Sequence, residues 1–165
     1  HPVVSVSLVV WNKAGAGVLD IDARFGIKTL LIGKAQFENS NEYIQVLKNE
    51  GITHIVLAGF LWKIPENLVK AYNNKIVNIH PALLPAFGGK GMYGERVHQE
   101  VINAGEQKSG ITIHLVDEHY DNGKTLFQAT VEVLPTDNPD SLAEKIHVLE
   151  HAHYPKVIAE WLKVK

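Results

Sequence analysis

Asn78 and His80 are the residues whose types and spacing most directly suggest chemistry. They lie two positions apart at the end of a strand predicted over residues 75–80, so their side chains point to the same side of a sheet. An amide and an imidazole can both donate hydrogen bonds to an oxygen that gains negative charge, and histidine exchanges a proton near neutral pH. Pro81 holds His80 in an extended conformation. A purely structural use of His80, bonding a backbone carbonyl, is the alternative.

The elements around this pair alternate between strands and helices. Apolar and β-branched runs predict strands over residues 3–10, 28–32, 54–58, 75–80, 110–116 and 124–134. Helical spacing and capping residues predict helices over 19–25, 41–50, 65–72 and 95–104, and from 138 onward, where Pro155 should break or kink the last helix.

This order predicts a single α/β domain over residues 1–165, an open, mostly parallel, doubly wound sheet with helices on both faces. In such sheets the ligand crevice lies beyond the carboxyl ends of the strands, where Asn78 and His80 are expected.

Composition excludes several classes of protein. Sixteen Lys and Arg against eighteen Asp and Glu give a net charge of −2, without a basic stripe, so we expect no nucleic-acid partner. The chain has no cysteine, and no apolar run approaches the length of a membrane span, so we expect no membrane association and a cytoplasmic location.

Two short motifs suggest other chemistry. Gly15-Ala16-Gly17 resembles part of a dinucleotide-binding loop, but Asp20 takes the place of the third glycine. His147-Val148-Leu149-Glu150-His151 matches an inverted zincin pattern, in which His153 is a candidate third ligand. Neither motif has the structural context that its chemistry needs, so we expect neither a nicotinamide cofactor nor a metal.

A longer set of motifs resembles the formyltransferases that use 10-formyltetrahydrofolate. The segment from Asn78 to Pro85 is similar to their Asn-x-His-x-x-Leu-Leu-Pro signature. Four further segments resemble the glycinamide ribonucleotide branch of that family in order and spacing: residues 87–94, 109–114, 116–123 and 150–155. The similarity extends from Trp11 to the C-terminal helix.

The resemblance implies catalytic roles for Asn78, His80 and Asp121, with His114 as a supporting residue. Formyl transfer to an amine passes through a tetrahedral intermediate whose oxygen becomes negative, and donors placed at that oxygen accelerate the reaction. Asp121 would accept the proton of the attacking amine, directly or through water, and would hold and charge His80.

The resemblance also implies two binding regions and their ligands. The co-substrate is 10-formyltetrahydrofolate, and the acceptor is glycinamide ribonucleotide. The folate would contact Leu61, Trp62, Ile64, Val116, Asp117 and Asp121, and the ribonucleotide would contact Pro81, Gly89, His147 and Glu150. For Leu61 and Ile64, burial in the core is an equally good interpretation.

The chain departs from the family at its beginning. Family members start with a strand and a Gly-Ser-Gly-Ser-Asn-like loop for the substrate phosphate, whereas the first strand here resembles their second. We therefore expect a truncated sequence that binds glycinamide ribonucleotide poorly, with a gap in its sheet. The alternatives are a deformylase, a methionyl-tRNA or amino-sugar formyltransferase, a zinc hydrolase, or a non-catalytic folate- or nucleotide-binding module. Sequence leaves the choice between a monomer and a homodimer open.

Overall fold

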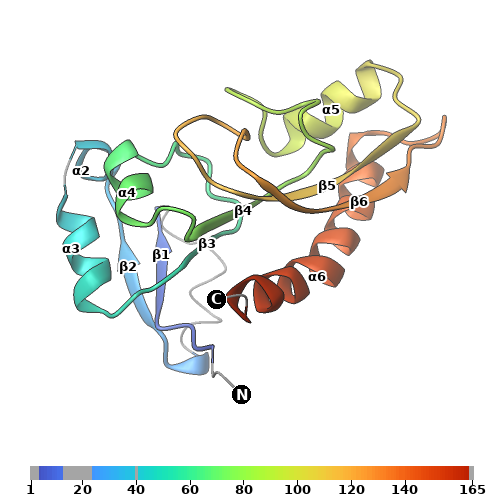
Figure 1. Ribbon diagram of the computed structural model, residues 1–165. Helices are drawn as coiled ribbons and strands as arrows, with labels where there is room; N and C mark the ends of the chain where they lie inside the picture. The colour runs from blue at the N-terminus through green and yellow to red at the C-terminus, as the bar shows by residue number, and fades with distance from the viewer. Residues whose placement is uncertain (1–3, 13–23, 40, 164–165) are drawn as a thin grey trace.

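The computed structural model describes residues 4–12, 24–39 and 41–163, which form strands and helices in alternation (Figure 1). In chain order these are β1 (Leu8–Trp11), β2 (Lys28–Leu31), α2 (Lys34–Asn39), α3 (Glu42–Asn49), β3 (Ile55–Leu57), α4 (Glu66–Ala71), β4 (Ile76–His80), α5 (Glu95–Asn103), β5 (Lys108–Leu115), β6 (Thr125–Glu132) and α6 (Pro139–Lys163).

The strands form two sheets in the described part of the chain. β1 pairs with β2 in parallel, and a four-stranded sheet has the order β3-β4-β5-β6. In the larger sheet β3 and β4 are parallel, whereas β5 runs antiparallel to both β4 and β6. The predicted α/β class is therefore confirmed, and both antiparallel pairings involve β5.

The two faces of β4 are covered by different sets of helices. Ile76 packs in a core with residues of α3, α4 and the β1–β2 pair, whereas its neighbour Val77 packs in a second core with residues of α5, β5 and α6. Successive side chains of a strand point to opposite faces, so helices lie on both sides of β4, as predicted. Asn78 and His80 share the face of Ile76.

Two predictions about individual elements need correction, one of them only in part. The first strand covers Leu8–Trp11 rather than residues 3–10, and Val4 and Val6 are exposed, because the pairing with β2 begins only at Leu8. Helix α6 continues through Pro155, so the predicted break does not occur, while a kink at that residue stays a prediction. Proline removes only one hydrogen bond of the helix ladder, and the buried neighbours Tyr154 and Val157 hold that turn against the core.

Helix α2 was not predicted, and the helix expected over residues 19–25 lies mostly outside the described residues. The other helices and strands lie within a few residues of their predicted positions.

Helix α6 begins where the sequence predicted. The Asn138 side chain accepts a hydrogen bond from the Ser141 amide at 2.9 Å, and the Ser141 hydroxyl accepts one from the Asn138 amide at 3.0 Å. This reciprocal cap satisfies amides that a helix start otherwise leaves unpaired. It fixes the start of the helix that carries His147 and Glu150.

Candidate active site

Asn78 and His114 lie directly opposite each other on β4 and β5. The ring of His114 donates from Nδ1 to the Leu115 carbonyl at 2.9 Å, because a carbonyl oxygen can only accept. In the neutral ring Nε2 is then the acceptor, and it lies 3.3 Å from the Asn78 amide nitrogen. His114 therefore orients the Asn78 amide and leaves its second N–H available to another acceptor.

His80 is buried, with 3% of its surface exposed. Its Nε2 donates to the Phe87 carbonyl at 2.7 Å, and its Nδ1 lies 3.6 Å from Oδ2 of Asp121. Burial lowers the pKa of His80 from its ordinary value, while the Asp121 carboxylate and the Phe87 carbonyl act to raise it. The neutral ring therefore carries its proton on Nε2, and a second proton would go to Nδ1, facing Asp121. The backbone contact that we considered as the alternative role of His80 is present, together with the carboxylate.

Asp121 brings the loop of residues 117–123 to this pair. Its Oδ2 accepts a hydrogen bond from the Gly89 amide at 2.9 Å, and its Oδ1 lies 3.7 Å from Nε2 of His114. The carboxylate thus lies between the rings of His80 and His114 and also ties down the glycine-rich segment of residues 88–94. The Asp121 side chain is 12% exposed.

The turn that follows His80 is held by Thr112 on β5. Thr112 is fully buried, and its hydroxyl donates to the Ala82 carbonyl at 2.7 Å and accepts from the Leu84 amide at 2.9 Å. Since Thr112 is the cross-strand partner of His80, one residue fixes both the end of the strand and the turn beyond it.

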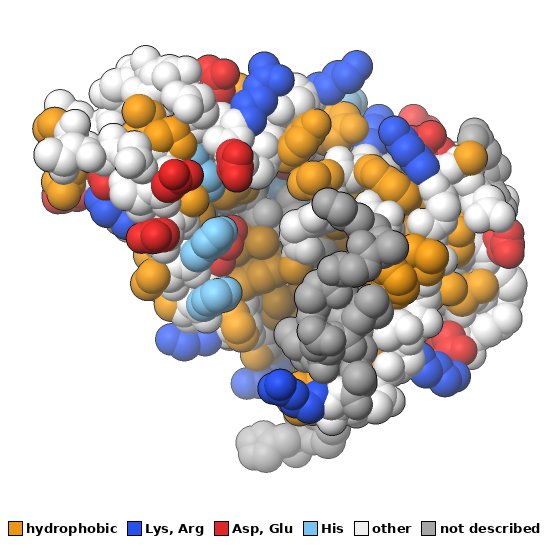
Figure 2. Space-filling view, turned by 180° about the vertical axis from the view of Figure 1, so that it is seen from behind, with side chains coloured by type: hydrophobic (Ala, Val, Ile, Leu, Met, Phe, Trp, Pro, Cys, Tyr) orange, Lys and Arg blue, Asp and Glu red, His pale blue; other side chains and the backbone are white. Residues whose placement is uncertain are grey.

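Asn78, His80, His114 and Asp121 line a cavity of about 1400 Å³. Figure 2 shows histidine and carboxylate side chains around a recess with hydrophobic side chains inside it. Every residue to which the sequence assigned a site role lines this cavity: Leu61, Trp62, Ile64, Asn78, His80, Pro81, Gly89, His114, Val116, Asp117, Asp121, His147 and Glu150. The fold brings together segments that are almost ninety residues apart in the chain.

One wall of the cavity is aromatic and apolar. Trp62 lies against Phe60 and Phe37, with ring centroids 5.8 and 5.9 Å apart. Ile64 is buried in the core while it lines the cavity, whereas Leu61 is 51% exposed. The wall can therefore cover a flat ring system, with Leu61 rather than Ile64 as the side chain that has surface to bury.

A second wall comes from α5 and α6. Burial raises the pKa of Glu150, and the nearby His147 and His151 oppose this shift. His98 of α5 is a lining residue that the sequence reasoning missed. It is 4% exposed, its Nδ1 is buried without a partner among the described residues, and burial, His147 and His80 lower its pKa. The sequence did offer one signal for His98: it lies three residues before Val101, on the apolar side of the predicted helix, and this spacing indicates a buried position.

The zincin-like pentapeptide has no third ligand beside it among the residues that the structure describes. His153, the candidate for that role, stacks on Phe127 with ring centroids 4.9 Å apart. Within residues 4–12, 24–39 and 41–163, no group of three His, Asp or Glu side chains is arranged to hold a metal ion. His147 and Glu150 line the cavity instead.

The fold is that of a formyl transferase. A family model described as "Formyl transferase" matches residues 1–158, and the chain belongs to that family. The chain is 44% identical over 158 residues to the chloroplastic phosphoribosylglycinamide formyltransferase of Arabidopsis thaliana, a match that covers 93% of this chain and 54% of the plant protein. It thus spans about half the length of that relative.

Bacterial relatives are covered more fully. The phosphoribosylglycinamide formyltransferase of Bacillus subtilis is 35% identical over 162 residues, which are 96% of this chain and 80% of the bacterial one. The crystal structure of the Bacillus halodurans phosphoribosylglycinamide formyltransferase superposes with a TM-score of 0.87 at 33% identity, covering 97% of this chain and 82% of the other. No helix in the described part of the chain is long and apolar enough to cross a membrane.

Proposed function

We propose that the protein transfers the formyl group of 10-formyltetrahydrofolate to the amine of glycinamide ribonucleotide. The observation that carries this proposal is the set of Asn78, His80, His114 and Asp121 at one cavity of a formyl transferase fold. The matches to the two relatives named phosphoribosylglycinamide formyltransferase cover at least nine-tenths of this chain, which supports the choice of acceptor.

The reaction needs donors at one oxygen and an acceptor for one proton. The amine nitrogen forms a bond to the formyl carbon, and the carbonyl electron pair moves to the oxygen. Collapse of this intermediate breaks the bond from the formyl carbon to N10 of the folate, which takes up a proton. The second N–H of Asn78 and a protonated Nδ1 of His80 are the groups to stabilise the oxygen, and the Asp121 carboxylate is the acceptor for the amine proton.

His80 has a specific constraint in this scheme. Its Nε2–H is taken by the Phe87 carbonyl, so the ring donates to the developing oxyanion through Nδ1, and only when it is protonated. Asp121 favours that protonated form against the cost of burial. We infer that Asp121 acts on His80 as well as on the amine.

The two walls of the cavity suit the two substrates. The surface around Trp62, Leu61, Val116 and Asp117 offers apolar cover and backbone groups for the pterin. The wall that carries His147 and Glu150, with Pro81 and Gly89 near the reaction centre, offers polar groups for a ribose and its amine. No step requires a metal.

The test is an assay of labelled formyl transfer from 10-formyltetrahydrofolate to a series of acceptors. We expect label on glycinamide ribonucleotide, and little on water, methionyl-tRNA or an amino sugar. Label released as formate would favour a deformylase. Label on another amine would identify that amine, and not glycinamide ribonucleotide, as the acceptor. Folate binding without any transfer would favour a non-catalytic module, and loss of activity to a chelator would favour a zinc enzyme. The cytoplasmic location and the choice between monomer and homodimer stay predictions.

A further inference from the structure

The loop that carries Asp121 separates two hollows. On one side lies the main cavity, and on the other an outer pocket of about 510 Å³ between this loop and the end of α4. Asp117 and His119 line both. The loop therefore has a cavity on each side, and packing against other elements gives it little support.

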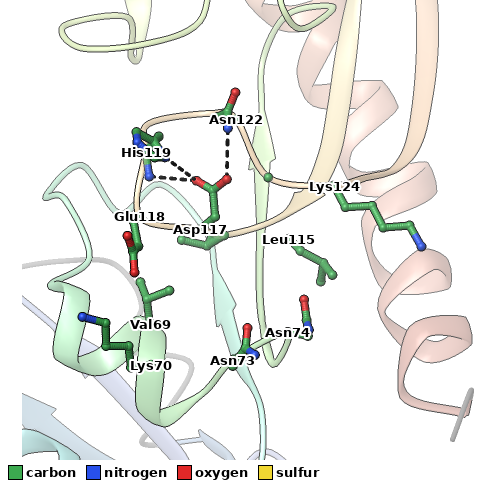
Figure 3. Close-up of a pocket in the computed structure, with 12 residues that line it drawn as sticks. Val69, Lys70, Asn73, Asn74, Leu115, Asp117, Glu118, His119, Asn122 and Lys124 are labelled. Atoms are coloured by element: carbon green, nitrogen blue, oxygen red, sulfur yellow. Dashed lines mark hydrogen bonds and ion pairs between the residues drawn. The ribbon is translucent and has the colours of Figure 1, made fainter.

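The Asp117 side chain bonds to the loop on both sides of Tyr120 and Asp121 (Figure 3). Its Oδ1 accepts a hydrogen bond from the His119 amide at 2.8 Å, and its Oδ2 accepts one from the Asn122 side-chain amide at 3.1 Å. The first bond fixes the beginning of the loop and the second ties down the residue directly after Asp121. A single carboxylate thus closes the loop across the residue that the chemistry needs.

The loop has a conformation that needs such support. Asp121 has a φ of +51°, a region that costs free energy for a residue with a side chain. The far end closes at Gly123, where a Cβ atom would lie 1.8 Å from the Leu115 carbonyl oxygen. The backbone at Asp121 is therefore strained while its carboxylate must stay 2.9 Å from the Gly89 amide.

We propose that Asp117 and Asn122 act as a pair of positioning residues that hold Asp121 beside His80. The proposal rests on the proposed function for its effect on catalysis, although the geometry that it describes does not. Neither side chain has to touch a reacting atom. Their role is to keep the loop in the one arrangement that brings the Asp121 carboxylate between the two imidazoles.

Exchange of the two side chains tests the pair. Asn122→Asp places two carboxylates where a carboxylate and an amide now meet, so the loop should open. In the double variant Asp117→Asn with Asn122→Asp, the amide introduced at position 117 keeps an oxygen for the His119 N–H. Its NH₂ group turns toward the carboxylate introduced at position 122, which restores the bond in the opposite sense. Asn122→Ala removes the bond to Asp117 without adding charge. It replaces Asn122→Asp in both measurements if the Asn122→Asp variant does not fold.

Two measurements are needed, and only one depends on the reaction. For formyl transfer at saturating folate, we expect kcat to fall about tenfold in Asn122→Asp, as the loss of a hydrogen bond to a charged group implies. This kcat should recover in the double variant, because the backbone groups of residue 117 that the pterin is proposed to contact are unchanged, and any change in folate affinity appears in KM. For the ring of His80, followed by NMR with labelled histidine, we expect its pKa to fall in Asn122→Asp, because Asp121 raises it. This pKa should return in the double variant.

Asn73→Asp is the matched control. It makes the same change of charge in the wall of the same outer pocket, away from the loop (Figure 3), and should leave both measurements at their wild-type values. An Asn122→Asp variant with an unchanged His80 pKa and an unchanged rate would overturn the proposal, as would a double variant as impaired as the single one. If the wild type transfers no formyl group, the proposed function fails, but the NMR titration still decides whether the pair positions Asp121.

Discussion

Replacement of Asp121 by Asn removes one charge and little else. The amide has the shape of the carboxylate, and its oxygen can still accept the hydrogen bond from Gly89 that the carboxylate accepts at 2.9 Å. The glycine-rich segment should therefore keep its place. What disappears is the negative charge 3.6 Å from Nδ1 of His80 and 3.7 Å from Nε2 of His114.

The size of the effect follows from these distances. Opposite unit charges about 3.6 Å apart attract by roughly 4–5 kcal/mol at an effective dielectric constant of about 20. Only 12% of the Asp121 side chain is exposed, so solvent screens the pair weakly. Each 1.4 kcal/mol corresponds to about tenfold in rate. Since the His80 imidazolium is needed only while the oxygen is negative, we expect kcat to fall by about 10²–10³-fold.

The assay compares kcat, the KM for each substrate and the titration of His80 in wild type and Asp121→Asn. We expect the KM for the folate co-substrate to change much less than kcat. The pKa of His80 should fall further below its ordinary value, because the burial that lowers it is then no longer opposed by the carboxylate. A variant with wild-type kcat would refute the role of Asp121, and a His80 pKa that does not move would refute the electrostatic explanation.

Three further predictions concern the framework around the site. Thr112→Val should lower the free energy of unfolding in urea by about 2–4 kcal/mol, because a buried carbonyl and a partly buried amide lose their partner; a change below about 0.5 kcal/mol would contradict this. The pKa of Asp137 is lowered to about 2, chiefly by its bond to Lys145, so this carboxylate stabilises the fold above pH 4, and its contribution is lost as the pH falls from about 4 to 2. Urea unfolding against pH should show a shallower loss in Asp137→Asn over that range, and identical slopes would refute the assignment. Gly110→Ala should give a protein that unfolds at least 10 °C below wild type or is insoluble, because the new methyl group would lie 2.0 Å from the Ala129 carbonyl oxygen; an unchanged melting temperature would show that β5 and β6 adjust.

The part of the site that the sequence predicted best is the part that depends on local geometry. Asn78 and His80 share a face because side chains alternate along any strand, and the strand itself is an apolar run with clear ends. The start of α6 at Asn138-Pro139 is likewise encoded within a few residues, and the reciprocal bonds with Ser141 confirm it.

The contacts between distant segments could not be predicted in the same way. That His114 lies opposite Asn78 depends on the register of two strands 36 residues apart along the chain, which no local pattern specifies. His98 reaches the cavity only because α5 packs beside α6. The hydrogen bond from the Asn122 side chain to Asp117 depends on how the seven-residue loop 117–123 closes. The short observed β1 shows the same limit, since Val4 and Val6 have the composition of a buried strand but no partner strand within the described part of the chain.

Tyr154 links helix α6 to strands β3 and β4 by hydrogen bonds. Its hydroxyl donates to the Leu57 carbonyl at the end of β3 at 2.7 Å and lies 3.3 Å from the Val77 carbonyl of β4. It therefore fixes α6 against both strands, one residue before Asn78 along β4. Glu150 precedes Tyr154 by four residues, so both lie on one face of the helix. A shift of α6 would strain the same bonds that hold β4 in place. The distance between Glu150 and Asn78 across the cavity is for this reason set by the core and not by the loops. The loop of Asp121 is then the part of the cavity lining that needs support of its own.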